Sequence, residues 1–113
     1  MMDWYKLVDK VPVKCENGDY PAYEPDDRRI CRTILPGGKY VSTVFLGLDH
    51  AFDGGDPLLF ETMVFSEETG LNGEDMDRYV TYEEAVQGHR DMVEKHGGRI
   101  LPTDFFDDDL FEL

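Results

Sequence analysis

Four side chains in this sequence could together carry out acid–base or metal chemistry: Asp49, His50, Glu61 and His89. A histidine beside two carboxylates is a general-base or metal-binding arrangement once folding brings the groups together. Asp49 and His50 end one apolar run, Glu61 belongs to the next, and His89 lies on the apolar side of an expected helix. The four, together with Arg78 and Tyr79, therefore form one candidate site if that helix packs over the two runs.

The same residues also have a structural interpretation, which we favour. Asp49 and His50 can shape a turn at the end of a strand. Glu61 can bind His50 or Arg78, and His89 can be a hydrogen-bonded core residue. No two histidines are three or four residues apart, the spacing that places two ligands on one helix face, so we expect no bound metal. With 41% hydrophobic and 12% aromatic residues, we expect the chain to fold without a required cofactor.

The C-terminal segment is a second candidate site, for a protein partner. It contains Asp104, Phe105, Phe106, Asp107, Asp108, Asp109, Leu110 and Phe111. The aromatic side chains of such a segment can dock in a groove rimmed by Lys or Arg, while the acids speed the encounter. The segment is similar to the acidic tail that recruits partners to bacterial single-stranded-DNA-binding proteins, although this chain ends in Glu112 and Leu113. The alternative is a tail folded back, with Phe105 and Phe106 covering the sheet.

The charge balance limits the partners. The 113 residues include 25 acids against 11 Lys and Arg, a formal net charge of −14. Such a field repels nucleic-acid backbones and anionic membrane surfaces, so we expect no direct binding to either. A host protein with a basic surface is the expected partner. Mimicry of a nucleic acid is one version of this expectation, and it requires carboxylates spaced like phosphates.

Cysteine usage and hydropathy bear on the cellular compartment. Cys15 and Cys31 are the only cysteines, and two cysteines make no dense disulfide framework, so we expect free thiols. We see no apolar leader and no run that approaches the ~20 residues needed to cross a bilayer. The sequence predicts a cytosolic protein.

The elements that must position the candidate residues are four strands and one helix. Branched and aromatic residues bounded by turn signals predict strands over residues 4–13, 28–35, 40–52 and 58–66. Residues 67–78 are interpreted as a polar connection. Thr81 is a good N-cap, with Glu84 placed to complete a capping box, and Gly97 ends a helix that can run to His96.

Two hairpins follow from the turn residues. A two-residue turn at Gly37 and Gly38 would set Leu35 opposite Tyr40 and Cys31 opposite Val44.

In the second hairpin, pairing of Phe52 with Leu58 would set Asp49 opposite Glu61 and Phe45 opposite Phe65. A shift by one residue would pair His50 with Glu61 instead, and the sequence leaves both registers open.

The predicted fold class is α+β, an antiparallel sheet of about four strands with one main helix packed on one face. The helix stripe that faces the sheet consists of Tyr82, Ala85, Val86, His89, Met92 and Val93, and it can extend to His96. We expect a single domain over residues 1–102, followed by the acidic and aromatic tail over residues 103–113.

The second hairpin also carries a family resemblance. The strings V-S-T-V-F-L-G-L-D-H (residues 41–50) and P-L-L-F-E-T-M-V-F (residues 57–65) resemble a family of small, uncharacterised proteins met in bacteriophage and prophage genomes. The string D-R-Y-V-T-Y-E-E-A-V-Q-G-H (residues 77–89) is similar to the same family. The resemblance implies expression in the cytoplasm of a bacterial host, and it implies no residue roles.

These observations give two expected functions. The first is an accessory protein without catalysis that binds a host protein, as an inhibitor or in a host-takeover or anti-defence role. The alternative is a small enzyme or a ligand- or metal-binding domain that uses Asp49, His50, Glu61 and His89. We favour the binding role.

Overall fold

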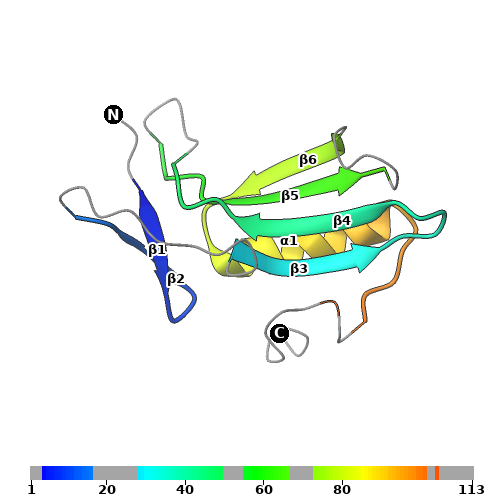
Figure 1. Cartoon of the computed structure of the whole chain (residues 1–113), viewed down its shortest axis with the longest axis horizontal. Coiled ribbons are helices and arrows are strands. Elements are labelled where there is room, and N and C mark those ends of the chain that lie inside the picture. The colour runs from blue at the N-terminus through cyan, green and yellow to red at the C-terminus, as the bar shows by residue number, and fades with distance from the viewer. Residues whose placement is uncertain (1–3, 17–27, 50–54, 67–72, 102–103, 105–113) are drawn as a thin grey trace.

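The computed structural model describes residues 4–16, 28–49, 55–66, 73–101 and 104, with the backbone alone at Gly73 and Glu74. His50 and residues 105–113 lie outside the described residues, and so do the predictions made for them. The described chain forms a two-stranded sheet, a four-stranded sheet and one helix (Figure 1).

The main sheet is an antiparallel meander in which each strand pairs with its neighbour in sequence. Its order is β3-β4-β5-β6. The strands are β3 (Arg29–Ile34), β4 (Tyr40–Phe45), β5 (Phe60–Phe65) and β6 (Gly73–Tyr79). The helix lies against one face of this sheet, so the predicted α+β fold with about four antiparallel strands and one main helix is confirmed.

The helix α1 (Tyr82–Lys95) begins and ends as its sequence predicts. Thr81 accepts a hydrogen bond from the Glu84 N–H, and the Glu84 carboxylate accepts one from the Thr81 N–H, which completes the capping box. At the other end Gly97 has φ 77° and its N–H donates to the carbonyl of Glu94, while Gly98 donates to that of Val93. These two bonds form a Schellman motif, a common end for a helix.

Alternation along the strands separates a buried face from a partly exposed one. Six of the predicted inward residues of α1, from Tyr82 to Val93, are buried, whereas His96 is the C-cap and is partly exposed. On the sheet, the buried face carries Cys31 and Thr33, Val41, Thr43 and Phe45, and Phe60, Thr62 and Val64. Intervening residues such as Glu61 and Met63 lie on the opposite face and are partly exposed.

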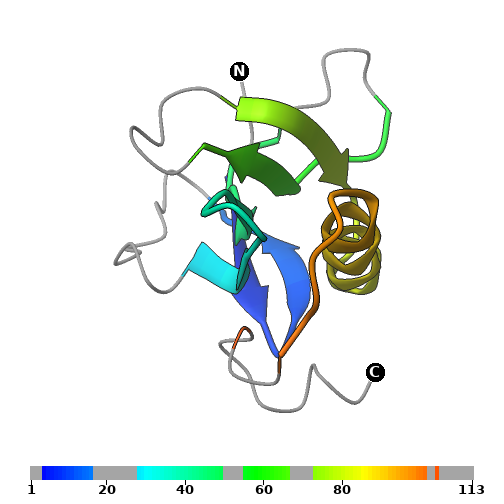
Figure 2. The same cartoon turned by 90° about the vertical axis from the view of Figure 1, so that its right-hand side faces the viewer.

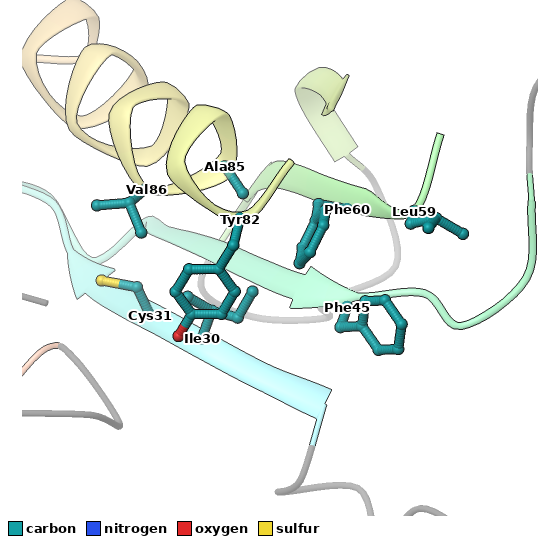
Figure 3. Packing of buried hydrophobic residues seen from close by; sticks show 8 residues of the cluster. All are labelled: Ile30, Cys31, Phe45, Leu59, Phe60, Tyr82, Ala85 and Val86. Carbon is teal, nitrogen blue, oxygen red and sulfur yellow. The ribbon is translucent and has the colours of Figure 1, made fainter. Parts of the chain in front are cut away.

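Aromatic rings fill the core near the start of the helix. Phe45 and Phe60 lie side by side on neighbouring strands with ring centroids 5.2 Å apart, and Tyr82 meets Phe60 edge-on at 5.8 Å (Figure 3). Such pairs contribute about 0.5–1.5 kcal/mol beyond the burial of their area. Tyr82 therefore fixes the first turn of α1 over β4 and β5.

The N-terminal segment is a hairpin, whereas a single strand over residues 4–13 was predicted. It consists of β1 (Tyr5–Val8) and β2 (Val11–Lys14), with Asp9 and Lys10 between them at φ 52° and 68°. Positive φ at both central residues is typical of a type I′ turn, which usually contains glycine. Because neither residue is glycine, the sequence pattern concealed the turn.

The register between β3 and β4 differs by one residue from the prediction. Ile34 lies opposite Tyr40 and Cys31 opposite Thr43, so the predicted pairs of Leu35 with Tyr40 and Cys31 with Val44 are wrong. The turn has three residues, since the Leu35 N–H donates to the carbonyl of Lys39.

The register between β4 and β5 differs from both predicted alternatives. Phe45 lies opposite Phe60, and Val44 opposite Glu61. The pairing of Asp49 with Glu61 and of Phe45 with Phe65 is therefore wrong, and so is a His50–Glu61 pair. The strand ends sooner than predicted because Gly47 takes φ 78°, beyond which Leu48 bridges Trp4 of the N-terminal hairpin.

The stretch predicted to be a polar connection contains strand β6. It occupies one end of the strand order, where a polar sequence is common because one edge is left for solvent. The N–H groups of Met76 and Arg78 donate to the side chains of Asp75 and Asp77, at 3.0 and 2.9 Å. Asp75 and Asp77, which made this segment resemble a connection in the sequence, thus accept hydrogen bonds from two backbone N–H groups of the strand.

Candidate functional site

The four predicted acid–base residues do not form one site in the described structure. Glu61 lies on the partly exposed face of the sheet, and His89 is buried beneath the other face. Asp49 accepts a hydrogen bond from the N–H of Leu58 at 3.1 Å, across the connection between β4 and β5. His50 lies outside the described residues.

Glu61 binds Arg78, one of the two partners expected for it. The two residues lie opposite each other on β5 and β6, and the Nε of Arg78 donates to a Glu61 carboxylate oxygen at 2.9 Å. Both side chains retain some exposure. The pair is a cross-strand ion pair on the face of the sheet away from α1.

His89 is enclosed by threonine hydroxyl groups. Its Nε2 lies 2.9 Å from Oγ1 of Thr33, and its Nδ1 lies 2.6 Å from Oγ1 of Thr43. The Thr43 hydroxyl continues to Thr62 at 2.6 Å, and the Thr33 hydroxyl donates to the Asp104 carboxylate at 3.0 Å. The histidine and all three threonines have no exposed surface, so a chain of hydrogen bonds crosses the core.

The carboxylate at one end of this chain fixes the direction of every proton. Asp104 only accepts, so Thr33 donates to it and receives the Nε2–H of His89. Nδ1 of His89 then accepts from Thr43, and Thr43 in turn accepts from Thr62. His89 is therefore the neutral Nε2–H tautomer.

Burial keeps His89 uncharged and keeps Cys31 protonated. Burial, and then the positive charge of Arg90, lowers the pKa of His89 to about 4. Burial, and then the negative charge of Asp104, raises the pKa of Cys31 to about 12. Both cysteines are free thiols, as predicted. A neutral, fully bonded histidine and a protonated thiol provide structure rather than reactivity.

A groove between β6 and α1 is the better candidate for a functional site, and the sequence pattern did not reveal it. Its volume is about 410 Å³. Figure 2 shows β6 curving over the sheet toward the helix. Met76 and Tyr79 from β6 and Gly88 and Met92 from α1 supply its uncharged lining.

The charged lining of this groove is mainly acidic. It comprises Asp75 and Asp77 from β6 and Asp91 and Lys95 from α1. Lys95 lies 2.7 Å from Asp75, which His96 also contacts at 3.0 Å, and these partners lower the pKa of Asp75 to about 2. Asp77 and Asp91 have no cationic partner within the described ranges of the chain.

Tyr79 lies among these carboxylates. Burial raises the pKa of its hydroxyl, and the charges of Asp77, Asp91 and Asp75 raise it further. Position 88 must be glycine for this arrangement, because a Cβ there would meet Cζ and Oη of Tyr79. The alternation of Asp75, Asp77 and Tyr79, which is typical of one face of a strand, is the sequence signal that could have indicated the groove.

Of the predicted partner-binding residues, Asp104 alone is described. Its carboxylate accepts from Thr33 and from the Leu101 N–H at 2.9 Å. Asp104 is thus tied to the body of the fold, whereas Phe105 to Phe111 lie outside the described residues.

Three further observations bear on the class of protein. No helix in the described ranges is both long and apolar enough to span a membrane. In the same ranges no three His, Cys, Asp or Glu side chains gather closely enough to hold a metal ion. Comparison of the chain with family models, with curated proteins and with solved structures finds no match.

Proposed function

We propose that this protein acts by binding a partner protein that presents a basic surface. In the setting that the resemblance to phage and prophage proteins implies, the partner is a host protein and the outcome is inhibition or redirection of that protein. The proposal needs no catalytic residue. Cationic groups on the partner would meet the carboxylates of this chain, which speeds encounter and selects the orientation of the complex.

The observation that carries the proposal is the pair of carboxylates on the β6–α1 groove without a cationic partner in the described chain. Asp77 and Asp91 stand beside uncharged groove surface from Met76, Tyr79 and Met92. A groove that joins apolar surface to a few charged groups is typical of a binding site. The formal net charge of −14 adds a long-range attraction toward basic partners.

The acidic and aromatic tail is the proposed second contact. Residues 105–113 contain Phe105, Phe106, Leu110 and Phe111 among four acids. Aromatic anchors of this kind would supply binding energy that exposed charge pairs alone do not supply.

The alternative of a small enzyme or ligand-binding domain has less support. It requires Glu61 and His89 to act together, and the sheet lies between them. Both nitrogens of His89 already have threonine partners, so no proton-accepting atom of this ring remains for a substrate.

A capture experiment from a bacterial host lysate tests the proposal. The full chain is immobilised beside a version that stops after Asp104, which keeps the carboxylate bound to Thr33. We expect the full chain to retain one or a few host proteins with basic surfaces, identified by mass spectrometry. Raising the salt from about 0.1 M to about 1 M should release them, because the Debye length falls from about 10 Å to about 3 Å.

The result separates the parts of the proposal. Retention by both versions would remove the tail from it, and loss with the shortened version would support the tail. Partners that are acidic, or that resist high salt in both versions, would contradict it.

A further inference from the structure

The β6–α1 groove combines negative charge with uncharged surface from the half-buried Tyr79 and the exposed Met76, and this combination defines its ligand. We propose that it binds one lysine or arginine side chain from an extended segment of the partner protein. The cationic head lies between Asp77 and Asp91, and the aliphatic stem lies on Tyr79 and Met76. This inference rests on the proposed function and specifies where, and by which chemical group, the partner is recognised.

The charges in the groove favour one additional cation. Three carboxylates face a single ammonium group there, that of Lys95. Lys95 is occupied by Asp75, while Asp91 accepts a hydrogen bond from the neutral amide of Gln87 at 2.9 Å. Asp75, Asp77 and Asp91 all line this groove, and the negative charge of each raises the pKa of the Tyr79 hydroxyl, so all three carboxylates act on the space around Tyr79. Because Lys95 and His96 already bind Asp75, a further cation in the groove would be attracted mainly by Asp77 and Asp91.

The shape of the groove suits a long aliphatic side chain. Lys and Arg bury their methylene stems on apolar surface while the charged head stays with polar groups. Tyr79 forms a partly exposed wall of the groove, and Met92 forms a buried one. Met76 lies at the rim, where its side chain is 48 % exposed. The absence of a Cβ at Gly88 lets the Tyr79 ring lie directly against the helix. A volume of about 410 Å³ lies toward the small end of the range for ligand pockets, ~300–1,000 Å³.

The edge of β6 favours recognition through a side chain over addition of a partner strand. Strand addition uses the outward N–H groups of an edge strand. On β6 the N–H groups of Met76 and Arg78 already donate to Asp75 and Asp77. An added strand would displace both carboxylates, whereas a cationic side chain uses them where they are.

The chain's own acidic tail does not suit the groove. Residues 104–113 carry five acids and no base, so Asp77 and Asp91 would repel them. The same repulsion disfavours phosphate and nucleic acid as ligands. A basic segment of another protein is the occupant that the charges favour.

Binding of a defined peptide to the full chain tests the inference. The probe is a rhodamine-labelled peptide of alternating lysine and valine, acetylated and amidated at its ends, and the readout is fluorescence anisotropy at low salt. Its matched control contains norleucine in place of lysine, which keeps the stem and removes the charge. We expect the lysine peptide to bind and the norleucine peptide to bind at least about tenfold more weakly, since two charge contacts are lost.

Two double variants with the same change in net charge locate the site. Asp77→Asn with Asp91→Asn removes the two groove carboxylates and should weaken binding about tenfold. Glu83→Gln with Glu94→Gln removes two exposed helix carboxylates outside the groove lining and should change binding less than about twofold. Circular dichroism establishes that all variants are folded.

The outcomes separate this inference from the proposed function. Equal weakening by both double variants would overturn the groove site and leave a general acidic surface, with the proposed basic partner intact. Equal binding of the norleucine peptide would overturn recognition of the cation. Absence of peptide binding, while the lysate experiment still yields a salt-sensitive basic partner, would also overturn the groove site. Selective loss with the Asp77 and Asp91 variant supports it.

Discussion

His89 and Asp91 are two residues apart on α1, and they enter opposite environments. His89 points into the core, where Thr33 and Thr43 bind both ring nitrogens and burial keeps the ring neutral. Asp91 lines the groove, where it and Asp77 have no cation in the described chain. In the core every buried polar side-chain atom of the described residues has a hydrogen-bond partner. His89, the residue more often found in catalytic sites, thus has a structural role, whereas Asp77 and Asp91 are the carboxylates that we propose bind a ligand.

The comparison predicts a large stability effect on the core side of the helix. His89→Ala should lower the free energy of unfolding by about 3–5 kcal/mol, because it opens a cavity and leaves the hydroxyls of Thr33 and Thr43 without their partner. Chemical denaturation measures this loss. The control is Gln87→Ala on the exposed side of α1, which should change stability by less than about 0.5 kcal/mol. A small effect at His89 would mean that the threonine cage is not as the structure shows.

The depressed pKa of His89 predicts a specific pH dependence. Burial lowers this pKa from 6.5 to about 4, so between these values the unfolded chain binds a proton that the folded chain does not. The stability due to neutral His89 is therefore complete above about pH 6.5 and is lost as the pH falls toward 4. The loss amounts to about 3 kcal/mol, at 1.36 kcal/mol per pKa unit.

Unfolding curves of the wild type and of His89→Gln between pH 7 and pH 4 measure this contribution. Gln does not titrate, so the variant should lack the part of the pH dependence that the wild type owes to His89. The lowered pKa of Asp75 acts in a more acidic window, from 3.8 down to about 2. Parallel curves for the two proteins would contradict the assignment.

Gly88 lies between the core and the groove, and substituting it should change the stability in the direction opposite to the usual one. Gly→Ala within a helix normally stabilises by about 1 kcal/mol. Here the new Cβ meets the ring of Tyr79, so Gly88→Ala should destabilise by about 1–2 kcal/mol. In a Tyr79→Ala background the same substitution should stabilise. A double-mutant cycle by thermal or chemical unfolding measures this reversal. Additive effects of Gly88→Ala and Tyr79→Ala on stability would contradict the contact between position 88 and the Tyr79 ring.

The smallest effect is expected on the opposite face of the sheet. Arg78→Gln removes the ion pair with Glu61 and should cost no more than about 1 kcal/mol, since both side chains are partly exposed. It should leave peptide binding in the groove unchanged within about twofold. If peptide binding falls strongly instead, the peptide also contacts the face of the sheet away from α1, and the groove is not the whole binding site.

The helix and the fold class follow from the sequence because their signals are local. Thr81, Glu84 and Gly97 mark the ends of α1, and the 3.6-residue period identifies the buried stripe that includes His89. The pairing of β4 with β5 was not predictable in this way. It depends on a bend of the chain at Gly47, after which Leu48 pairs with Trp4, 44 residues earlier in the sequence. It also depends on matching the inward faces of the two strands.

The groove was hidden for a related reason. Asp75 and Asp77 make β6 look like a connection, because aspartate is rare in strands. They are tolerated because β6 ends the strand order and their side chains occupy its outward N–H groups. The proximity of Asp77 and Asp91 then depends on packing of the helix against this strand, which no local pattern encodes.

The most direct test of the groove between β6 and α1 as a binding site is an NMR titration of the isotopically labelled full chain with the lysine–valine peptide. We expect amide chemical-shift changes concentrated in residues 75–79 and 88–95, which contain the groove lining. We also expect little change at Thr33, Thr43 and Thr62 on the buried face of the sheet. Shift changes spread over the acidic surface, or centred on β3 and β4 with the groove unaffected, would contradict binding in the groove.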